Sequence, residues 1–162
     1  MAIQELELGD APFILELLNT PQYIQFIGDK NVHCIKDAEA NIQERIDSYT
    51  SNGFGLWLVT LKEIGAPVGT CGLIKRDTLE DVDIGFAFHP DYFKKGYAYE
   101  AAMACLRYGY KKLALSKIVG ITDEDNQSSI KLLEKLGLQF EKELETPDSK
   151  KVLLFSPIKK PD

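Results

Sequence analysis

A strand-like stretch leads into a basic turn near the middle of the chain. Residues 82–88 alternate bulky and small side chains, and Lys94, Lys95 and Gly96 precede a helical pattern that begins at Tyr97. Gly96 lets a ligand approach the backbone closely, and the first amides of a helix lack acceptors within the helix. Their partial positive charge favours an anion in front of the turn. The pattern therefore predicts a phosphate cradle.

This turn lacks the two common nucleotide signatures. No G-x-G-x-x-G opens the helix, and no G-K-[ST] follows Gly96. The sequence therefore favours a phosphate-bearing ligand of another kind, and a nucleotide-binding regulator is disfavoured.

A second polar segment, residues 126–137, begins at Asn126 and ends at Gly137. Together with residues 95–101, it resembles the cofactor motifs of the GNAT family of N-acetyltransferases, in the expected order and spacing. The similar branch is that of the ribosomal-protein alanine and serine N-acetyltransferases, and the resemblance extends from about Ile3 to Phe155. Further similar segments lie upstream, at residues 19–21, 27–29, 53–55 and 68–73.

The resemblance implies an α/β (α+β) fold with a mixed, mostly antiparallel sheet, splayed central strands and flanking helices. It also implies that the pantetheine arm of acetyl-CoA inserts between the splayed strands. Strand amides would then bind the arm and polarise the thioester carbonyl, while amides of the turn would bind the pyrophosphate. The matching cofactor-binding positions are Phe86, Ala87, Phe88, Lys94, Lys95, Gly96, Tyr97, Ala98, Tyr99, Asn126 and Ser129.

Acetyl transfer to an amine needs a neutral amine, a stabilised oxyanion and a proton for the departing thiolate. Many members of the family place a tyrosine acid where this chain has Leu133, so that role is not carried over. The resembling branch implies a serine near the sulfur instead, which points to Ser129, with Ser128 one position away. A serine hydroxyl is a poor acid, so it would relay a proton or bind the thiolate. No Gly-x-Ser-x-Gly elbow is present, which favours direct transfer.

Carboxylates near strand ends are the candidate bases and acceptor ligands. Asp83 lies on the small-residue face of its strand and Glu80 in the preceding turn, and either is a candidate general base. Asp29 and Tyr23, in the early helical region, are candidates for binding the acceptor. Residues 123–125 could steer a cation, although such carboxylates are also typical of exposed loop ends.

Composition narrows the function class. The 162 residues fit a single domain, 1–162, and the formal net charge of −6 disfavours a nucleic-acid surface. No apolar run approaches the ~20 residues that cross a bilayer, and the N-terminus lacks a signal-peptide pattern. Three cysteines without a C-x-x-C pair predict small, buried or half-buried thiols in a cytoplasmic protein. Two separated histidines predict no metal site.

Hydrophobic spacing predicts both the elements and their order. Three consecutive strands should form an antiparallel meander, and a strand–helix–strand unit should add a parallel strand. The strands are expected at residues 3–8, 56–61, 68–75, 81–88, 117–122, 138–144 and 151–156. The helices are expected from Asp10 to Thr20 and at residues 23–27, 37–51, 97–113 and 126–136.

We therefore expect an acetyltransferase that moves an acetyl group from acetyl-CoA to a primary amine, either a protein N-terminus or a small amine. The alternative is a non-catalytic acyl-CoA-binding sensor or scaffold, which the leucine at position 133 leaves open. No nucleic-acid or membrane partner is expected, and the protein is expected as a monomer or homodimer.

Overall fold

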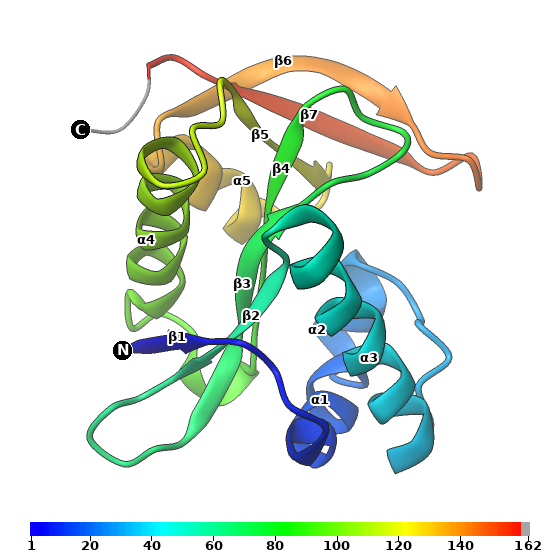
Figure 1. Cartoon of the computed structure of the whole chain (residues 1–162). Coiled ribbons are helices and arrows are strands. Elements are labelled where there is room, and N and C mark those ends of the chain that lie inside the picture. The colour runs from blue at the N-terminus through cyan, green and yellow to red at the C-terminus, as the bar shows by residue number, and fades with distance from the viewer. Residues whose placement is uncertain (160–162) are drawn as a thin grey trace.

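Seven strands form one sheet across the molecule, with helices on both faces (Figure 1). The computed structural model describes residues 1–159. The strand order is β1-β2-β3-β4-β5-β7-β6, and every neighbouring pair is antiparallel except β4 and β5. The strands are β1 (Ala2–Gln4), β2 (Leu56–Thr60), β3 (Pro67–Ile74), β4 (Val82–Phe88), β5 (Ile118–Asp123), β6 (Leu138–Glu145) and β7 (Lys151–Pro157).

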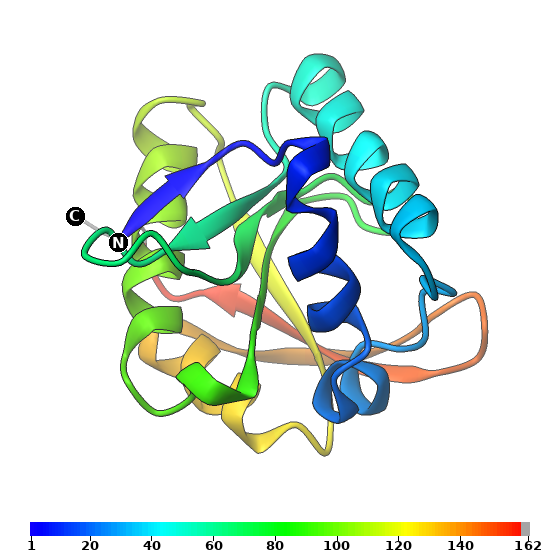
Figure 2. The same cartoon turned by 90° about the horizontal axis from the view of Figure 1, so that it is seen from below.

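Helices cover the sheet in two groups, visible in Figures 1 and 2. The first three pack together on one face, and the last two cover the other. The α-helices are α1 (Ala11–Leu18), α2 (Pro21–Phe26), α3 (Ile35–Asn52), α4 (Tyr97–Lys111) and α5 (Gln127–Lys135); the short 3-10 segments are η1 (Leu8–Asp10) and η2 (Pro90–Tyr92). Each group encloses a separate apolar core, one around Ile14 and Ile42 and the other around Leu106 and Leu133.

Side chains of β4 alternate between these two cores. Ile84 and Phe88 are buried in the core beneath α4, whereas Ala87 packs against the core of α1 and α3. Gly85 faces the same way as Ala87, because residues two apart in a strand point to the same face. The predicted bulky and open faces of this strand are therefore confirmed.

The two central strands diverge soon after they meet. β4 and β5 pair only at Val82–Ile118 and Asp83–Val119. Beyond these pairs each strand keeps its other neighbour, β3 for β4 and β7 for β5, while their facing edges separate. Figure 2 shows the gap from below, between β4 and β5. The splayed, mostly antiparallel sheet expected from the resemblance is confirmed.

Most element boundaries agree with the sequence within a few residues, but the first strand is shorter than predicted. β1 ends at Gln4, and Leu6 is buried among α1 and α3, where its amide donates to the Tyr49 hydroxyl at 3.2 Å. The alternating pattern of residues 3–8 thus spans a strand end and a core contact. Cys34 is exposed, so the expectation of three buried thiols is wrong for it, while Cys71 and Cys105 are buried. No helix among residues 1–159 is long and apolar enough to cross a membrane.

Candidate active site

The backbone of β4 presents free hydrogen-bonding groups to the gap. The His89 amide donates to the Val68 carbonyl at 2.9 Å, which fixes the direction in which alternate residues face. The backbone N–H and C=O of Ala87 therefore point toward its partner Thr70 on β3. Those of Phe86 and Phe88 point the other way, toward the gap. Of the three amides proposed for cofactor binding, two are oriented to bind an inserted chain and the third belongs to the β3–β4 ladder.

The turn between η2 and α4 has the conformation of an anion cradle. Lys94 and Gly96 both have positive φ, 59° and 81°, and α4 starts immediately afterwards at Tyr97. Gly96 is the N-cap and offers no side-chain acceptor to the first helical amides. These amides, with the exposed Lys94 and Lys95 beside them, fit a phosphate-bearing ligand. The positive φ favours glycine here. Lack of space does not, since a Cβ at this position would meet no atom within 4 Å.

The start of α5 lies directly after the diverging end of β5. Asn126 caps this helix, its Oδ1 accepting from the Ser129 amide at 3.2 Å. Ser129 is half-buried and Ser128 is exposed. Leu133, at the position where relatives are expected to carry tyrosine, is buried and packs over Gly120 of β5, where a Cβ would lie 2.6 Å from Leu133 Cδ2. Leu133 is thus a core residue, and Asn126 has a structural role whatever ligand it contacts.

Asp83 sits at the last paired position of β4 and is 1% exposed. Its Oδ1 accepts from Arg76 Nε at 3.0 Å. Burial raises the pKa of Asp83 to about 6, and the Arg76 guanidinium opposes only part of that rise. A carboxylate with this pKa is ionised at neutral pH and still binds a proton appreciably, as a general base requires.

The other two predicted carboxylates do not join Asp83. Glu80 is exposed before the start of β4, at the end where β4 and β5 remain paired, and its carbonyl accepts from Lys75 Nζ at 3.1 Å. Asp29 is exposed and closes a local turn, accepting from the Asn31 amide at 2.8 Å. Of these three carboxylates, Asp83 alone is buried, while the roles of Glu80 and Asp29 stay predictions.

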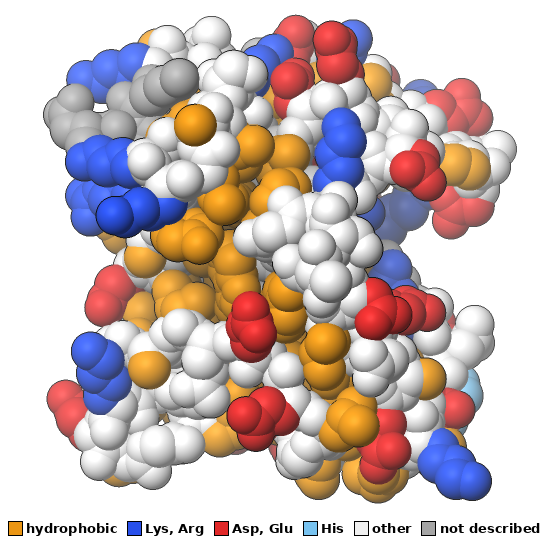
Figure 3. Space-filling view, viewed as in Figure 1, with side chains coloured by type: hydrophobic (Ala, Val, Ile, Leu, Met, Phe, Trp, Pro, Cys, Tyr) orange, Lys and Arg blue, Asp and Glu red, His pale blue; other side chains and the backbone are white. Residues whose placement is uncertain are grey.

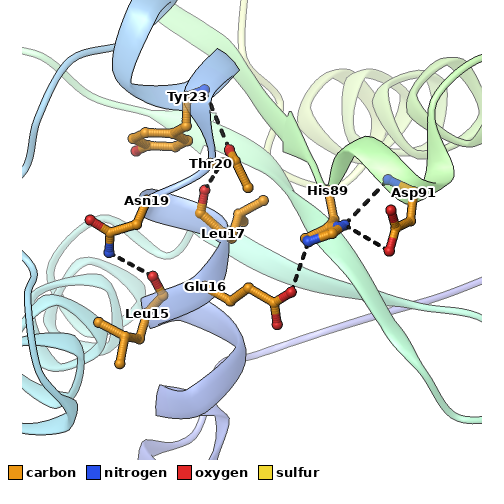
Figure 4. Close-up of polar contacts among 8 residues, drawn as sticks. All are labelled: Leu15, Glu16, Leu17, Asn19, Thr20, Tyr23, His89 and Asp91. Atoms are coloured by element: carbon orange, nitrogen blue, oxygen red, sulfur yellow. Dashed lines mark hydrogen bonds and ion pairs between the residues drawn. The ribbon is translucent and has the colours of Figure 1, made fainter.

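Contacts at the α1–α2 turn fix Tyr23 on the α1–α3 side of the sheet (Figure 4). The Thr20 hydroxyl donates to the Leu17 carbonyl at 2.9 Å and accepts from the Tyr23 amide at 3.4 Å. His89, at the end of β4, pairs with Glu16 of α1 at 2.9 Å. Helix α1 is thereby attached to the strand that lines the gap, and Tyr23 is buried beside it.

Basic side chains gather on this same side, which the sequence did not predict. The Tyr23 phenol interacts with Arg45 of α3 and with Arg76. The pKa of Lys30 is lowered, mainly by desolvation and further by the same two guanidinium groups. Lys150, in the β6–β7 hairpin, donates to the Phe26 carbonyl and pairs with Asp123, both at 3.2 Å. Figure 3 shows Lys and Arg side chains in the indentation at the right, below this hairpin.

The position of Arg45 could have been predicted from the helical pattern of α3. Arg45 follows Ala38 and Ile42 at helical spacing, on the inward face of α3, and Asn41 lies on that face one turn earlier. Polar residues at core-facing positions of a helix indicate a built polar site. The remaining basic residues lie in loops, and local sequence patterns do not predict that these loops come together in the fold.

Comparison with known proteins agrees with this geometry. Residues 1–139 match the family model of the acetyltransferase (GNAT) domain. YnaD of Bacillus subtilis, named as an uncharacterized N-acetyltransferase, is 27% identical over 141 residues, 87% of this chain and 80% of that protein. YkkB of the same organism, named only as an uncharacterized protein, is 34% identical over 92 residues, which are 56% of this chain and 54% of YkkB.

A solved structure is similar over nearly the whole chain. The ribosomal-protein-S5-alanine acetyltransferase of Vibrio fischeri superimposes with a TM-score of 0.81, covering 96% of this chain and 91% of that one. At 18% identity, this likeness shows the fold alone. The family model, in contrast, matches the sequence itself from β1 into β6 and includes both sides of the gap. The chain belongs to the GNAT family of acetyltransferases.

Proposed function

We propose that this enzyme transfers the acetyl group of acetyl-CoA directly to a primary amine bound on the α1–α3 side of the gap. The divergence of β4 and β5 after Asp83 carries the proposal. Facing strand edges need hydrogen-bonding partners, and an extended arm such as pantetheine supplies them as an added strand would. The Phe86 and Phe88 amides would bind the arm, and the turn from Lys94 to Tyr99 would bind its pyrophosphate.

The carbonyl of the acetyl group would accept a hydrogen bond from the exposed edge of β4, which stabilises negative charge on its oxygen. Asp83 would take a proton from the acceptor ammonium, directly or through water, and later release it to solvent. The neutral amine then forms a bond to the carbonyl carbon as the carbon–sulfur bond breaks. The attached nitrogen then loses a second proton, which Ser129 would relay to the thiolate, so the products are the N-acetyl amine and free CoA.

The acceptor class is a protein N-terminus or a small amine. The Vibrio fischeri enzyme is named for an alanine of a ribosomal protein, which supports the first option by fold alone. We place the enzyme in the cytoplasm, as a monomer or homodimer acting without a nucleic-acid or membrane partner.

Release of free CoA across a panel of amines tests transfer. The purified protein with acetyl-CoA should release the thiol only when an accepted amine is added, and mass spectrometry should find one acetyl group on that amine. Binding of acetyl-CoA without amine-dependent release would contradict the proposal and indicate a cofactor sensor.

Gly96→Val should weaken acetyl-CoA binding at least tenfold, which corresponds to ~1.4 kcal/mol. The residue has φ 81°, so a β-branched side chain distorts the turn and places bulk before the helical amides. Gly65→Val is the matched control, since Gly65 has φ 68° in the turn between β2 and β3, with an equally open Cβ position. Titration calorimetry decides: equal affinities for the two folded variants would exclude the cradle.

Ser129→Ala should lower kcat by ~10²-fold and change the KM for acetyl-CoA little, because proton delivery acts on the chemical step. Ser128→Ala, at the exposed neighbouring position of the same helical turn, should retain activity. Single-turnover rates with a saturating amine give the comparison. If the Ser128 variant loses the activity and the Ser129 variant keeps it, Ser129 is only part of the helix start.

Asp83→Asn should remove a pH dependence from folding stability. The folded-state pKa of Asp83, about 6, lies above its ordinary value of 3.8, so the stabilisation from protonation is full below pH 3.8 and is lost as pH rises through 6. This difference corresponds to ~3 kcal/mol. The free energy of unfolding of Asp83→Asn, relative to the wild type, should therefore rise by up to that amount between pH 4 and 7.

Urea titrations at both pH values measure this difference. Asp77→Asn, at an exposed position in the same connection, controls for the loss of one negative charge. A difference between wild type and Asp83→Asn that stays constant across this range would mean that the Asp83 carboxyl keeps its ordinary pKa and is a poorer base.

A further inference from the structure

We infer that the acceptor amine carries a carboxylate and that Arg45 of α3 binds that group, so the substrate class is a free amino acid. This inference rests on the proposed transfer to an amine and names its acceptor.

A buried, unpaired guanidinium nitrogen is the starting observation. Within residues 1–159, Arg45 Nη1 is inaccessible to solvent and has no hydrogen-bond acceptor. One helical turn earlier, Asn41 Oδ1 is equally buried and has no donor. Leaving such groups unpaired is unfavourable, most of all for a charged one. The guanidinium nitrogen calls for a ligand that offers an acceptor.

Charge pairing on this side of the sheet leaves two cations, Arg45 and Lys30, without an ion pair among the described residues. Arg76 is paired with Asp83, and Lys150 with Asp123. Neither Arg45 nor Lys30 forms an ion pair with any carboxylate of the described chain, although Lys30 lies near enough to Arg45 for their charges to interact. An anionic group on the ligand balances these charges, and a carboxylate matches a guanidinium with two parallel hydrogen bonds.

Arg45 lies on the same face of the sheet as the proposed base. It lines a recess of about 140 Å³ together with Leu56 and Ile74. Glu44 and Lys75, one anion and one cation, also line this recess, so Arg45 supplies its net positive charge. Both apolar side chains also lie over Gly85, since a Cβ there would be 3.1 Å from Leu56 Cδ2 and 2.7 Å from Ile74 Cδ1. Asp83 precedes Gly85 by two residues and shares its orientation along β4.

The size of the recess favours a small ligand. Its volume is roughly that of five water molecules in the liquid, enough for a carboxylate and a few attached atoms. A zwitterionic amino acid supplies the acceptor for Arg45 and the amine for acetyl transfer in one compact molecule. An acidic peptide N-terminus offers the same charge but requires room for the following residues.

Matched acceptors test the inference. The wild-type enzyme is assayed for CoA release with the common L-amino acids and, in parallel, with their C-terminal amides, which keep the amine and lack the carboxylate. The preferred amino acid should exceed its amide at least tenfold in kcat/KM. Arg45→Met, which keeps the length of the side chain, should raise the KM for that amino acid at least tenfold without changing the KM for acetyl-CoA or for the amide. Arg107→Met, at an exposed position of α4, is the control and should retain wild-type values.

The results separate this inference from the proposed function. Equal or better turnover of the amides, or a preference for peptides with acidic first residues, overturns the amino-acid assignment and leaves acetyl transfer standing. The absence of CoA release from every acceptor overturns both. If Arg45→Met fails to fold, the wild-type comparison of acids with amides decides by itself, and Arg45→Lys should keep the preference for the acid.

Discussion

Buried backbone groups must find hydrogen-bonding partners, and the facing edges of β4 and β5 stop supplying them to each other beyond Asp83 and Val119. The two strands pair over two positions and then part, although each remains fixed by its outer neighbour. A linear ligand with amide groups, such as pantetheine, matches this opening in shape and in chemistry. The rest of the site is organised around the point where pairing stops.

Asp83 occupies that point and violates the usual preference for apolar residues in a central strand. The single partner Arg76 does not restore the ordinary pKa of the carboxyl, since burial acts more strongly than the ion pair. A buried ion pair of this kind is weak evidence for stability. Its placement beside the gap, on the face opposite α4, is better explained by a requirement for a proton acceptor near neutral pH.

Cofactor-side features could be predicted from the sequence because they are local. The alternation of β4, the basic turn at Gly96 and the helix start at Asn126 each depend on a few consecutive residues. Their proximity in the sequence groups Glu80 with Asp83. The strand begins between them, so Glu80 lies in an exposed turn and Asp83 is buried in β4. The sequence also groups the Ala87 amide with those that face the gap. The direction of this amide is set by pairing with Thr70 on another strand, which a local pattern does not show.

The acceptor side could not be predicted in the same way. Arg45, Arg76 and Lys150 belong to a helix, a loop and a hairpin that meet only in the folded chain. The sequence emphasised acidic residues, with net charge −6, and so suggested carboxylates for a cationic acceptor. Folding instead pairs Asp83 with Arg76 and Asp123 with Lys150, which leaves Arg45 and Lys30 without an ion pair among the described residues.

A basic recess suits the chemistry of an amine nucleophile. Nearby positive charges disfavour the ammonium form, so the pKa of a bound amine falls and a larger fraction is neutral and able to attack. The same charges repel a simple ammonium ion from the recess, and binding then requires a compensating anion on the acceptor. In the proposed reaction, a carboxylate on the substrate would meet that requirement at Arg45 while Asp83 would remove the proton from the amine. The positive field that hinders binding of a plain amine thus favours both recognition and activation of one that carries its own negative charge.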